Sequence, residues 1–273
     1  MEHTYTIRCG EDDLAATLHY PSEGKGGQDS RYPLIVICHG FVGSRVGANR
    51  LFVKAARQFS ELGYMTLRFD YAGCGESTGD YGAGGVDAMV AQTRRILDYI
   101  LDHDCVDPAR VTLIGHSLGG LVSILTAAQD RRVKQLALWA PVAHPFNDIV
   151  RIVGKPLYEE AMRSGSVDYL GYSLKSSFFD SLMDAHPLEQ IRKINGDVLL
   201  IHGTGDDVIP VDYTFLYQKV FWLREEGQCD KEVLFMADHT FSSGEHQDAC
   251  IGKTCDWLKF IEKRRTDWTH WTI

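Results

Sequence analysis

The 273-residue sequence lacks several features that would each define a class of protein. It has no apolar run long enough to cross a membrane, and its first residues contain neither the basic nor the apolar segment of a secretory signal. Its formal charge is -9, and it has no stripe of Lys and Arg with which to neutralise nucleic-acid phosphates. These absences predict a cytoplasmic protein without membrane or nucleic-acid partners.

Cysteine pairing and metal-ligand spacing are also missing. The seven cysteines are scattered, without a C-x-x-C, at positions 9, 38, 74, 105, 229, 250 and 255. An odd, unclustered set suits a reducing compartment better than a disulfide framework. Cys250 and Cys255 have no His partners at ligand spacing, so we expect no metal and no cofactor.

Strand-like and helix-like segments alternate along most of the chain. This alternation predicts one α/β domain with an eight-stranded, mostly parallel sheet flanked by helices, whose first two strands pair antiparallel. The expected strands are Tyr5–Arg8, Leu14–His19, Leu34–Cys38, Met65–Phe69, Val111–Gly115, Leu136–Trp139, Val198–His202 and Val233–Met236. The expected helices are Asn49–Leu62, Val86–His103, Leu118–Gln129, Tyr213–Glu226 and Gln247–Lys263.

The rhythm breaks between residues 143 and 195, where aromatic residues are frequent but follow no strand pattern. We interpret this stretch as a lid segment inserted between two parts of the core, residues 1–142 and 196–273. Such a segment is expected over the carboxyl ends of the strands, where it would line a pocket. An ordinary pair of surface helices is the alternative interpretation.

The tail, Asp267–Ile273, is unusually apolar for a chain end. We expect it to pack on its own domain or on a second subunit, and Trp268 and Trp271 suggest a homodimer as a hypothesis.

A serine nucleophile is indicated by the run VTLIGHSLGG at residues 111–120. An apolar strand-like run stops at Gly115, and a helix-like run starts behind Ser117. A serine at the tip of a sharp strand-to-helix turn needs small residues two positions away on each side, and Gly115 and Gly119 provide them. The pattern G-x-S-x-G is weak alone, so the interpretation depends on partners elsewhere.

The partners that a serine nucleophile needs are a base and a carboxylate that orients the base. Asp206 and His239 each follow an expected strand, in the loops where catalytic groups of open α/β sheets collect. Two other carboxylates compete with Asp206. We interpret Asp207 as a solvated turn residue and Asp238 as a surface or helix-capping residue.

An oxyanion hole must supply N–H donors where charge develops on the attacked carbonyl. The backbone N–H of Phe41, in the His39-Gly40-Phe41 turn, and that of Leu118, directly after the nucleophile, are the two candidates.

Five short motifs fall in a familiar order: HGF at 39–41, RFDYAGCGES at 68–77, GHSLGG at 115–120, HGTGDDVIP at 202–210 and ADHTF at 237–241. Together they resemble the α/β-hydrolases of the esterase and lipase type, and are most similar to bacterial feruloyl/cinnamoyl esterases. The resemblance implies the α/β-hydrolase fold and cofactor-independent cleavage of a small-molecule ester through an acyl-enzyme.

The same resemblance implies that lid residues hold the aromatic ring of the substrate. Asp148 occupies a position that matches one such residue, and Tyr172 and Phe179 are the aromatic candidates. Two other functions stay open at this point. One is a serine peptidase or acyl-peptide hydrolase of the same fold, and the other is a catalytically silent binding module.

Overall fold

The computed structural model describes residues 1–21 and 31–269, with side chains described as far as Asp267. Eight strands in this part of the chain form one sheet with the order β1-β2-β4-β3-β5-β6-β9-β10. Strand β2 pairs antiparallel with β1 and β4, and the other neighbours are parallel. The strands are β1 (Glu2–Cys9), β2 (Asp12–His19), β3 (Tyr32–Cys38), β4 (Met65–Phe69), β5 (Val106–His116), β6 (Gln135–Trp139), β9 (Asp197–Gly203) and β10 (Cys229–Leu234).

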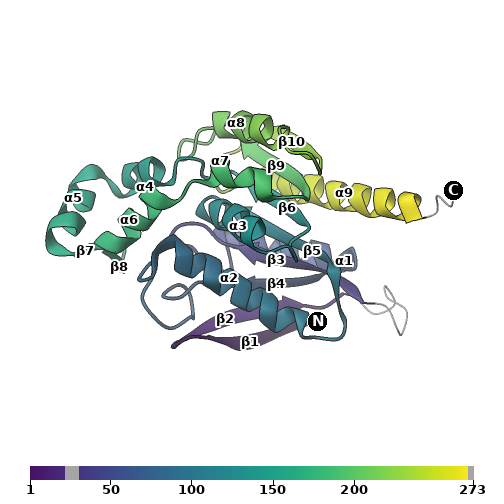
Figure 1. Ribbon diagram of the computed structural model, residues 1–273, viewed down its shortest axis with the longest axis horizontal. Coiled ribbons are helices and arrows are strands. Elements are labelled where there is room, and N and C mark those ends of the chain that lie inside the picture. The colour runs from purple at the N-terminus through teal and green to yellow at the C-terminus, as the bar shows by residue number, and fades with distance from the viewer. Residues whose placement is uncertain (22–30, 270–273) are drawn as a thin grey trace.

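Helices cover both faces of the sheet (Figure 1). They are α1 (Leu51–Glu61), α2 (Gly85–Leu101), α3 (Leu118–Gln129), α8 (Asp212–Phe221) and α9 (Gly244–Thr269). Strand β3 shows how the sequence serves both faces, because successive side chains point in opposite directions. Leu34, Val36 and Cys38 join the core shared with α2, α3 and α8, whereas Ile35 and Ile37 join the core shared with α1 and α9. The predicted α/β-hydrolase fold is confirmed.

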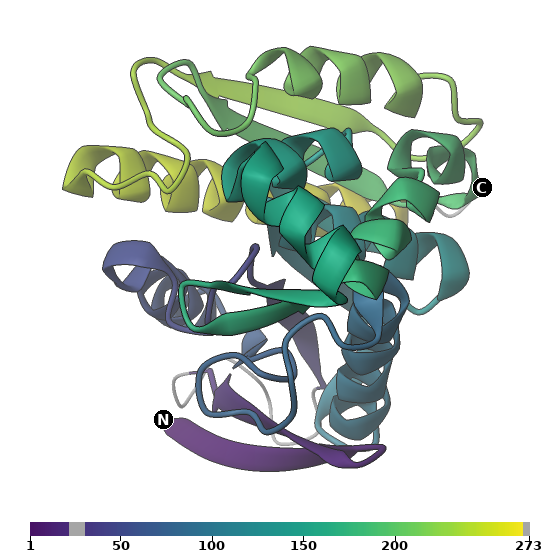
Figure 2. The same ribbon diagram turned by 90° about the vertical axis from the view of Figure 1, so that its left-hand side faces the viewer.

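The lid segment enters directly after the carboxyl end of β6, and most of it, from α4 to α6, gathers at one end of the sheet, on the left in Figure 1 and facing the viewer in Figure 2. It contains α4 (Pro145–Val153), α5 (Lys155–Ser164), β7 (Ser166–Tyr169), β8 (Tyr172–Lys175), α6 (Ser176–Asp184) and α7 (Pro187–Gln190). Strands β7 and β8 form an antiparallel hairpin that the sequence did not predict, because each is only 4 residues long. Its turn places Leu170 and Gly171 in the left-handed region, with φ of 55° and 85°.

Several element boundaries differ from expectation, and β10 and α8 are two examples. The last strand was expected at Val233–Met236 but lies at Cys229–Leu234, since Met236 adopts a φ of 58° that no extended strand allows. Helix α8 ends at Phe221 rather than at Glu226.

Within residues 1–21 and 31–269, no helix combines the length and the apolar character needed to span a bilayer. The expected docking of the tail depends on Trp271 and on the side chain of Trp268, which lie outside the described residues. A homodimer through these residues stays a prediction.

Candidate active site

Ser117 sits on the sharp turn between β5 and α3. Its backbone has φ 56° and ψ −121°, a conformation that costs most non-glycine residues about 1–3 kcal/mol. The neighbouring glycines make this turn fit. A Cβ on Gly115 would lie 2.4 Å from the carbonyl oxygen of Gly119, and a Cβ on Gly119 would lie 2.2 Å from that of Cys38. The strained turn therefore explains the two glycines that the sequence indicated.

The three side chains expected to work together are in contact. The Oγ of Ser117 lies 2.9 Å from Nε2 of His239, and Nδ1 of His239 lies 2.8 Å from Oδ2 of Asp206. Because the carboxylate can only accept, Nδ1 carries the proton and Nε2 is left to accept from the serine hydroxyl. This is the arrangement in which an imidazole can withdraw a proton from a serine.

The carboxyl of Asp206 is buried yet held in its ionised form. Burial by itself would raise the pKa of this group, but hydrogen bonds from His202 and His239 hold the pKa below its usual range. The backbone N–H groups of Val208 and Ile209 donate to the other oxygen, Oδ1, at 2.9 and 2.8 Å. Asp206 can thus stabilise a positive charge on His239.

The base is also held through its own backbone. Nε2 of His116 lies 2.8 Å from the carbonyl oxygen of His239, and the two rings are 4.9 Å apart. Burial, with the charge of His239 as a second cause, lowers the pKa of His116 to about 3. His116 is therefore a neutral donor at neutral pH.

The peptide between Gly40 and Phe41 is aimed by hydrogen bonds to its carbonyl. Nδ1 of His39 and the N–H of Gly43 donate to the oxygen of Gly40 at 2.9 and 3.1 Å. In a planar trans peptide the N–H points opposite to the C=O, so the N–H of Phe41 points away from these donors. Burial lowers the pKa of His39, which keeps its ring neutral.

The two expected oxyanion donors are free to bind a ligand. Leu118 opens α3, where backbone N–H groups have no partner within the helix. In the part of the chain that the structure describes, the N–H groups of Phe41 and Leu118 donate to no protein acceptor. The two loops touch, since a Cβ on Gly40 would lie 3.1 Å from the Cβ of Ser117.

A cavity of about 500 Å³ opens over Ser117. Its walls combine apolar and aromatic side chains from the core and the lid segment with the polar atoms of residues 39–44, which we call the oxyanion loop. The larger apolar side chains that line it are Phe41, Val42, Leu51, Phe52, Ile152, Tyr169, Tyr172 and Val208. Cavities of this size and character bind small organic molecules.

The lid segment packs directly on the oxyanion loop. The ring of Phe41 stacks on Phe178 at 5.9 Å between centroids and contacts Tyr169 at 5.7 Å. The hydroxyl of Tyr172 donates to the carbonyl oxygen of Val42 at 3.5 Å. The lid therefore forms one wall of the cavity and packs against Phe41, the residue whose N–H is an expected oxyanion donor.

Of the three lid residues expected to touch substrate, Tyr172 lines the cavity and the other two do not. Phe179 is fully buried, and its ring packs on Tyr158 and Phe178 inside the lid segment. Asp148 is buried as well, and its carboxylate accepts from the Tyr213 hydroxyl at 3.0 Å. Both expectations are corrected: these side chains are occupied by contacts within the protein.

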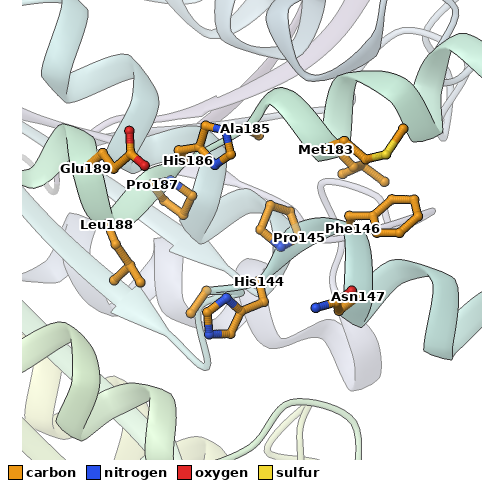
Figure 3. Close-up of a pocket in the computed structure, with 12 residues that line it drawn as sticks. His144, Pro145, Phe146, Asn147, Met183, Ala185, His186, Pro187, Leu188 and Glu189 are labelled. Atoms are coloured by element: carbon orange, nitrogen blue, oxygen red, sulfur yellow. The ribbon is translucent and has the colours of Figure 1, made fainter.

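A second cavity, of about 380 Å³, lies between the start of α4 and the chain that joins α6 to α7 (Figure 3). Its described lining includes exposed histidines, His144 and His186, but none of the groups around Ser117. The described residues contain no group of three or more His, Cys, Asp or Glu side chains placed to hold a metal ion.

Two further residues at the site were not expected from the sequence: His202, which donates to Asp206, and Thr214, which contacts His202. The motif that contains Asp206 also contains His202 four residues earlier, and this spacing is the signal that could have identified it.

Comparisons with known proteins agree with the fold described above. Residues 33–163 match the family described as alpha/beta hydrolase fold. An Escherichia coli protein, the "Uncharacterized 31.7 kDa protein in traX-finO intergenic region", is 39% identical over 123 residues, 45% of this chain and 40% of that protein. Lysophosphatidylserine lipase ABHD12 of Xenopus tropicalis is 35% identical over 185 residues, 66% of this chain and 44% of the lipase. The chain thus spans less than half the length of these two relatives.

Among solved structures, Est1E from Butyrivibrio proteoclasticus with ferulic acid bound is similar, with a TM-score of 0.76. The two sequences are 22% identical, and the match covers 93% of this chain and 97% of Est1E. At this level of identity the likeness concerns the fold.

Proposed function

We propose that this chain, which has the α/β-hydrolase fold, is a serine hydrolase that cleaves carboxylic esters through an acyl-enzyme. The observation that carries the proposal is the continuous hydrogen-bonded path from Ser117 through His239 to Asp206, beside a cavity and two free N–H groups. That path supplies a nucleophile, a base and a carboxylate in one place.

The proposed reaction begins when Oγ of Ser117 attacks the ester carbonyl carbon and its proton passes to Nε2 of His239. The N–H groups of Phe41 and Leu118 hold the negative oxygen of the tetrahedral intermediate, and Asp206 stabilises the imidazolium. The ester C–O bond then breaks as His239 protonates the leaving alcohol. A water molecule, deprotonated by the same imidazole, attacks the acyl carbon and releases the acid and the free serine.

The cavity supports small aryl or acyl esters, of the feruloyl and cinnamoyl type, as the proposed substrates. Its volume of about 500 Å³ and its aromatic wall suit a single ring or a medium-length chain. Phe41, Tyr169 and Tyr172 offer ring faces on which an aryl group can pack. Est1E, which has been solved with ferulic acid bound, lends support by its similar fold.

The test is hydrolysis of p-nitrophenyl acetate, butyrate and decanoate and of methyl ferulate by the native chain and by Ser117→Ala. The matched control is Ser164→Ala, on the exposed end of α5. We expect turnover by the native chain and the control, none by Ser117→Ala, and the highest kcat/KM with methyl ferulate.

A fluorophosphonate probe, which labels activated serines, separates mechanism from substrate. Labelling of Ser117 with turnover of the short esters alone would retain the serine hydrolase and reject the hydroxycinnamate substrate. Absence of both labelling and turnover would reject the enzyme and favour a binding role.

A further inference from the structure

Two imidazoles meet at one oxygen of Asp206. Nε2 of His202, near the end of β9, lies 3.0 Å from Oδ2, the same atom that accepts from Nδ1 of His239 at 2.8 Å. Resting on the proposed serine hydrolysis, we infer that His202 is a positioning residue, a fourth member of the catalytic chain that holds the acid in place for the base. The chain then runs from Ser117 through His239 and Asp206 to His202.

The surroundings of His202 fix which of its nitrogens carries the proton. Nε2 faces two acceptors, Oδ2 of Asp206 and the carbonyl oxygen of Ile209, each at 3.0 Å, and so must be the donor. Nδ1 lies 2.8 Å from Oγ1 of Thr214, whose hydroxyl can donate to it. A neutral imidazole satisfies every one of these contacts, and the side chain is fully buried.

The contacts of His202 restrain rotation of the Asp206 carboxylate. The amide donors of Val208 and Ile209 hold Oδ1, and the fully buried His202 holds Oδ2 together with the partly exposed His239. Carboxylate torsions are broad when unrestrained, so this second anchor limits rotation of Oδ2 away from His239. A displacement of about 1 Å at a catalytic group can cost about a hundredfold in rate.

The hydrogen bond from His202 also means that Oδ2 of Asp206 interacts with two N–H donors, those of His202 and His239. Without the N–H of His202, Oδ2 would direct more of its negative charge at His239 and favour its protonated form. Among the described residues, the other titratable ring in contact with His239 is that of His116, at the buried end of β5. A missing donor at His202 should therefore move the pH dependence of the base, which simple loosening of the fold would not do.

Two amide variants differ in which nitrogen of the imidazole they replace. The amide of His202→Gln reaches the Nε2 position and can still donate to Asp206, whereas the shorter amide of His202→Asn reaches only the Nδ1 position beside Thr214. We expect His202→Asn to lower the rate of fluorophosphonate labelling of Ser117 by about 10- to 100-fold and His202→Gln to retain most of it. His186→Asn, at the second cavity, is the control expected to match the native rate.

The labelling rate is measured as a function of pH, and near-ultraviolet circular dichroism reports folding. In His202→Asn the midpoint of the pH profile should move to higher pH. If folded His202→Asn labels at the native rate with the native midpoint, or if both amide variants lose labelling equally, the inference is wrong. Should His202→Asn not fold, Thr214→Val provides the second variant, with an expected loss of about threefold; an unchanged rate in that variant would overturn the inference.

The labelling readout needs no knowledge of the ester that the enzyme cleaves. If the native chain labels but hydrolyses none of the test esters, the proposed substrate fails while the comparison of the His202 variants still stands. If the native chain does not label at all, the proposed serine hydrolysis itself fails.

Discussion

Arg151, on lid helix α4, donates a hydrogen bond to the backbone carbonyl of Val208, two residues beyond the acid Asp206. The N–H of that same Val208 donates to Asp206. The lid segment is therefore joined to the loop that holds the carboxylate. Arg151 also lies within 3.4 Å of Asp148, which is anchored to Tyr213.

Removing this link is expected to weaken catalysis, because it loosens the loop that holds Asp206. Arg151→Met keeps an unbranched apolar chain but loses the donor, and a net hydrogen-bond contribution of about 1 kcal/mol corresponds to about a fivefold loss of kcat/KM. Steady-state kinetics against Arg163→Met, an exposed arginine on α5, provides the measurement and its control. Equal kinetics in the two variants would contradict the link.

We expect that adding one methyl group to the oxyanion loop, in Gly40→Ala, lowers kcat strongly. In Gly40→Ala the new Cβ would lie 3.1 Å from the Cβ of Ser117 and 3.3 Å from the carbonyl oxygen of His116, so the loop and the nucleophile must separate by a few tenths of an ångström. Loss of one oxyanion donor costs about 2.7–4 kcal/mol, so we expect kcat to fall about a hundredfold or more.

The control for that variant is Gly252→Ala, in the middle of α9, where an added Cβ meets no atom within 4 Å. It should leave kcat unchanged and stabilise the protein by about 0.5–1 kcal/mol in denaturant unfolding. A similar loss of kcat in both variants would contradict the specific role of Gly40.

Lid residues are expected to separate into those that contact substrate and those that hold the lid together. Tyr172→Ala removes a ring from the cavity wall and should raise KM for methyl ferulate about tenfold, as loss of an aromatic contact of about 1.4 kcal/mol implies. Asp148→Asn changes a side chain that does not line the cavity, so its KM should stay near the native value. A large KM effect from Asp148→Asn would restore the substrate contact that the geometry argues against.

Buried neutral histidines predict lower stability in mild acid. Burial lowers the pKa of His19 to about 4 and that of His116 to about 3, whereas an unfolded histidine has a pKa near 6.5. Between about pH 6.5 and 4 the unfolded chain therefore binds more protons, and stability rises with pH by up to about 1.4 kcal/mol per pH unit for each histidine.

Urea unfolding at pH 7 and pH 5 measures this effect. The midpoint should be lower at pH 5, and His19→Asn should reduce the difference between the two pH values. A stability that does not change between pH 7 and pH 5 would contradict the prediction.

The sequence was sufficient to predict which residues meet around Ser117, because each stands at the end of a recognisable strand. Parallel strands end at the same edge of a sheet, so the topology places Ser117, Asp206 and His239 at one edge. The lid residues do not stand at the ends of sheet strands, so the topology does not place them. Whether Asp148 and Phe179 face a substrate or the protein depends on how short helices pack, and local sequence does not encode that packing.

His202 shows a further limit of sequence reasoning. In the pattern it is the polar end of an apolar strand, and its spacing of four residues from Asp206 does not by itself show that the two side chains meet. Its contact with Asp206 depends on how the loop after β9 folds back, which is fixed by the N–H groups of Val208 and Ile209 binding the carboxylate.

The left-handed backbone conformation of Ser117 makes the proposed activity and the stability of the fold conflicting requirements at this position. A glycine at position 117 would adopt φ 56° without steric cost but could not act as a nucleophile, so the fold alone would favour a residue that abolishes the proposed chemistry. The turn survives because the sheet and helix α3 on either side of it are densely packed. Any engineering that loosens β5 or α3 would therefore let this turn relax first, and the nucleophile would be lost while most of the molecule stayed folded.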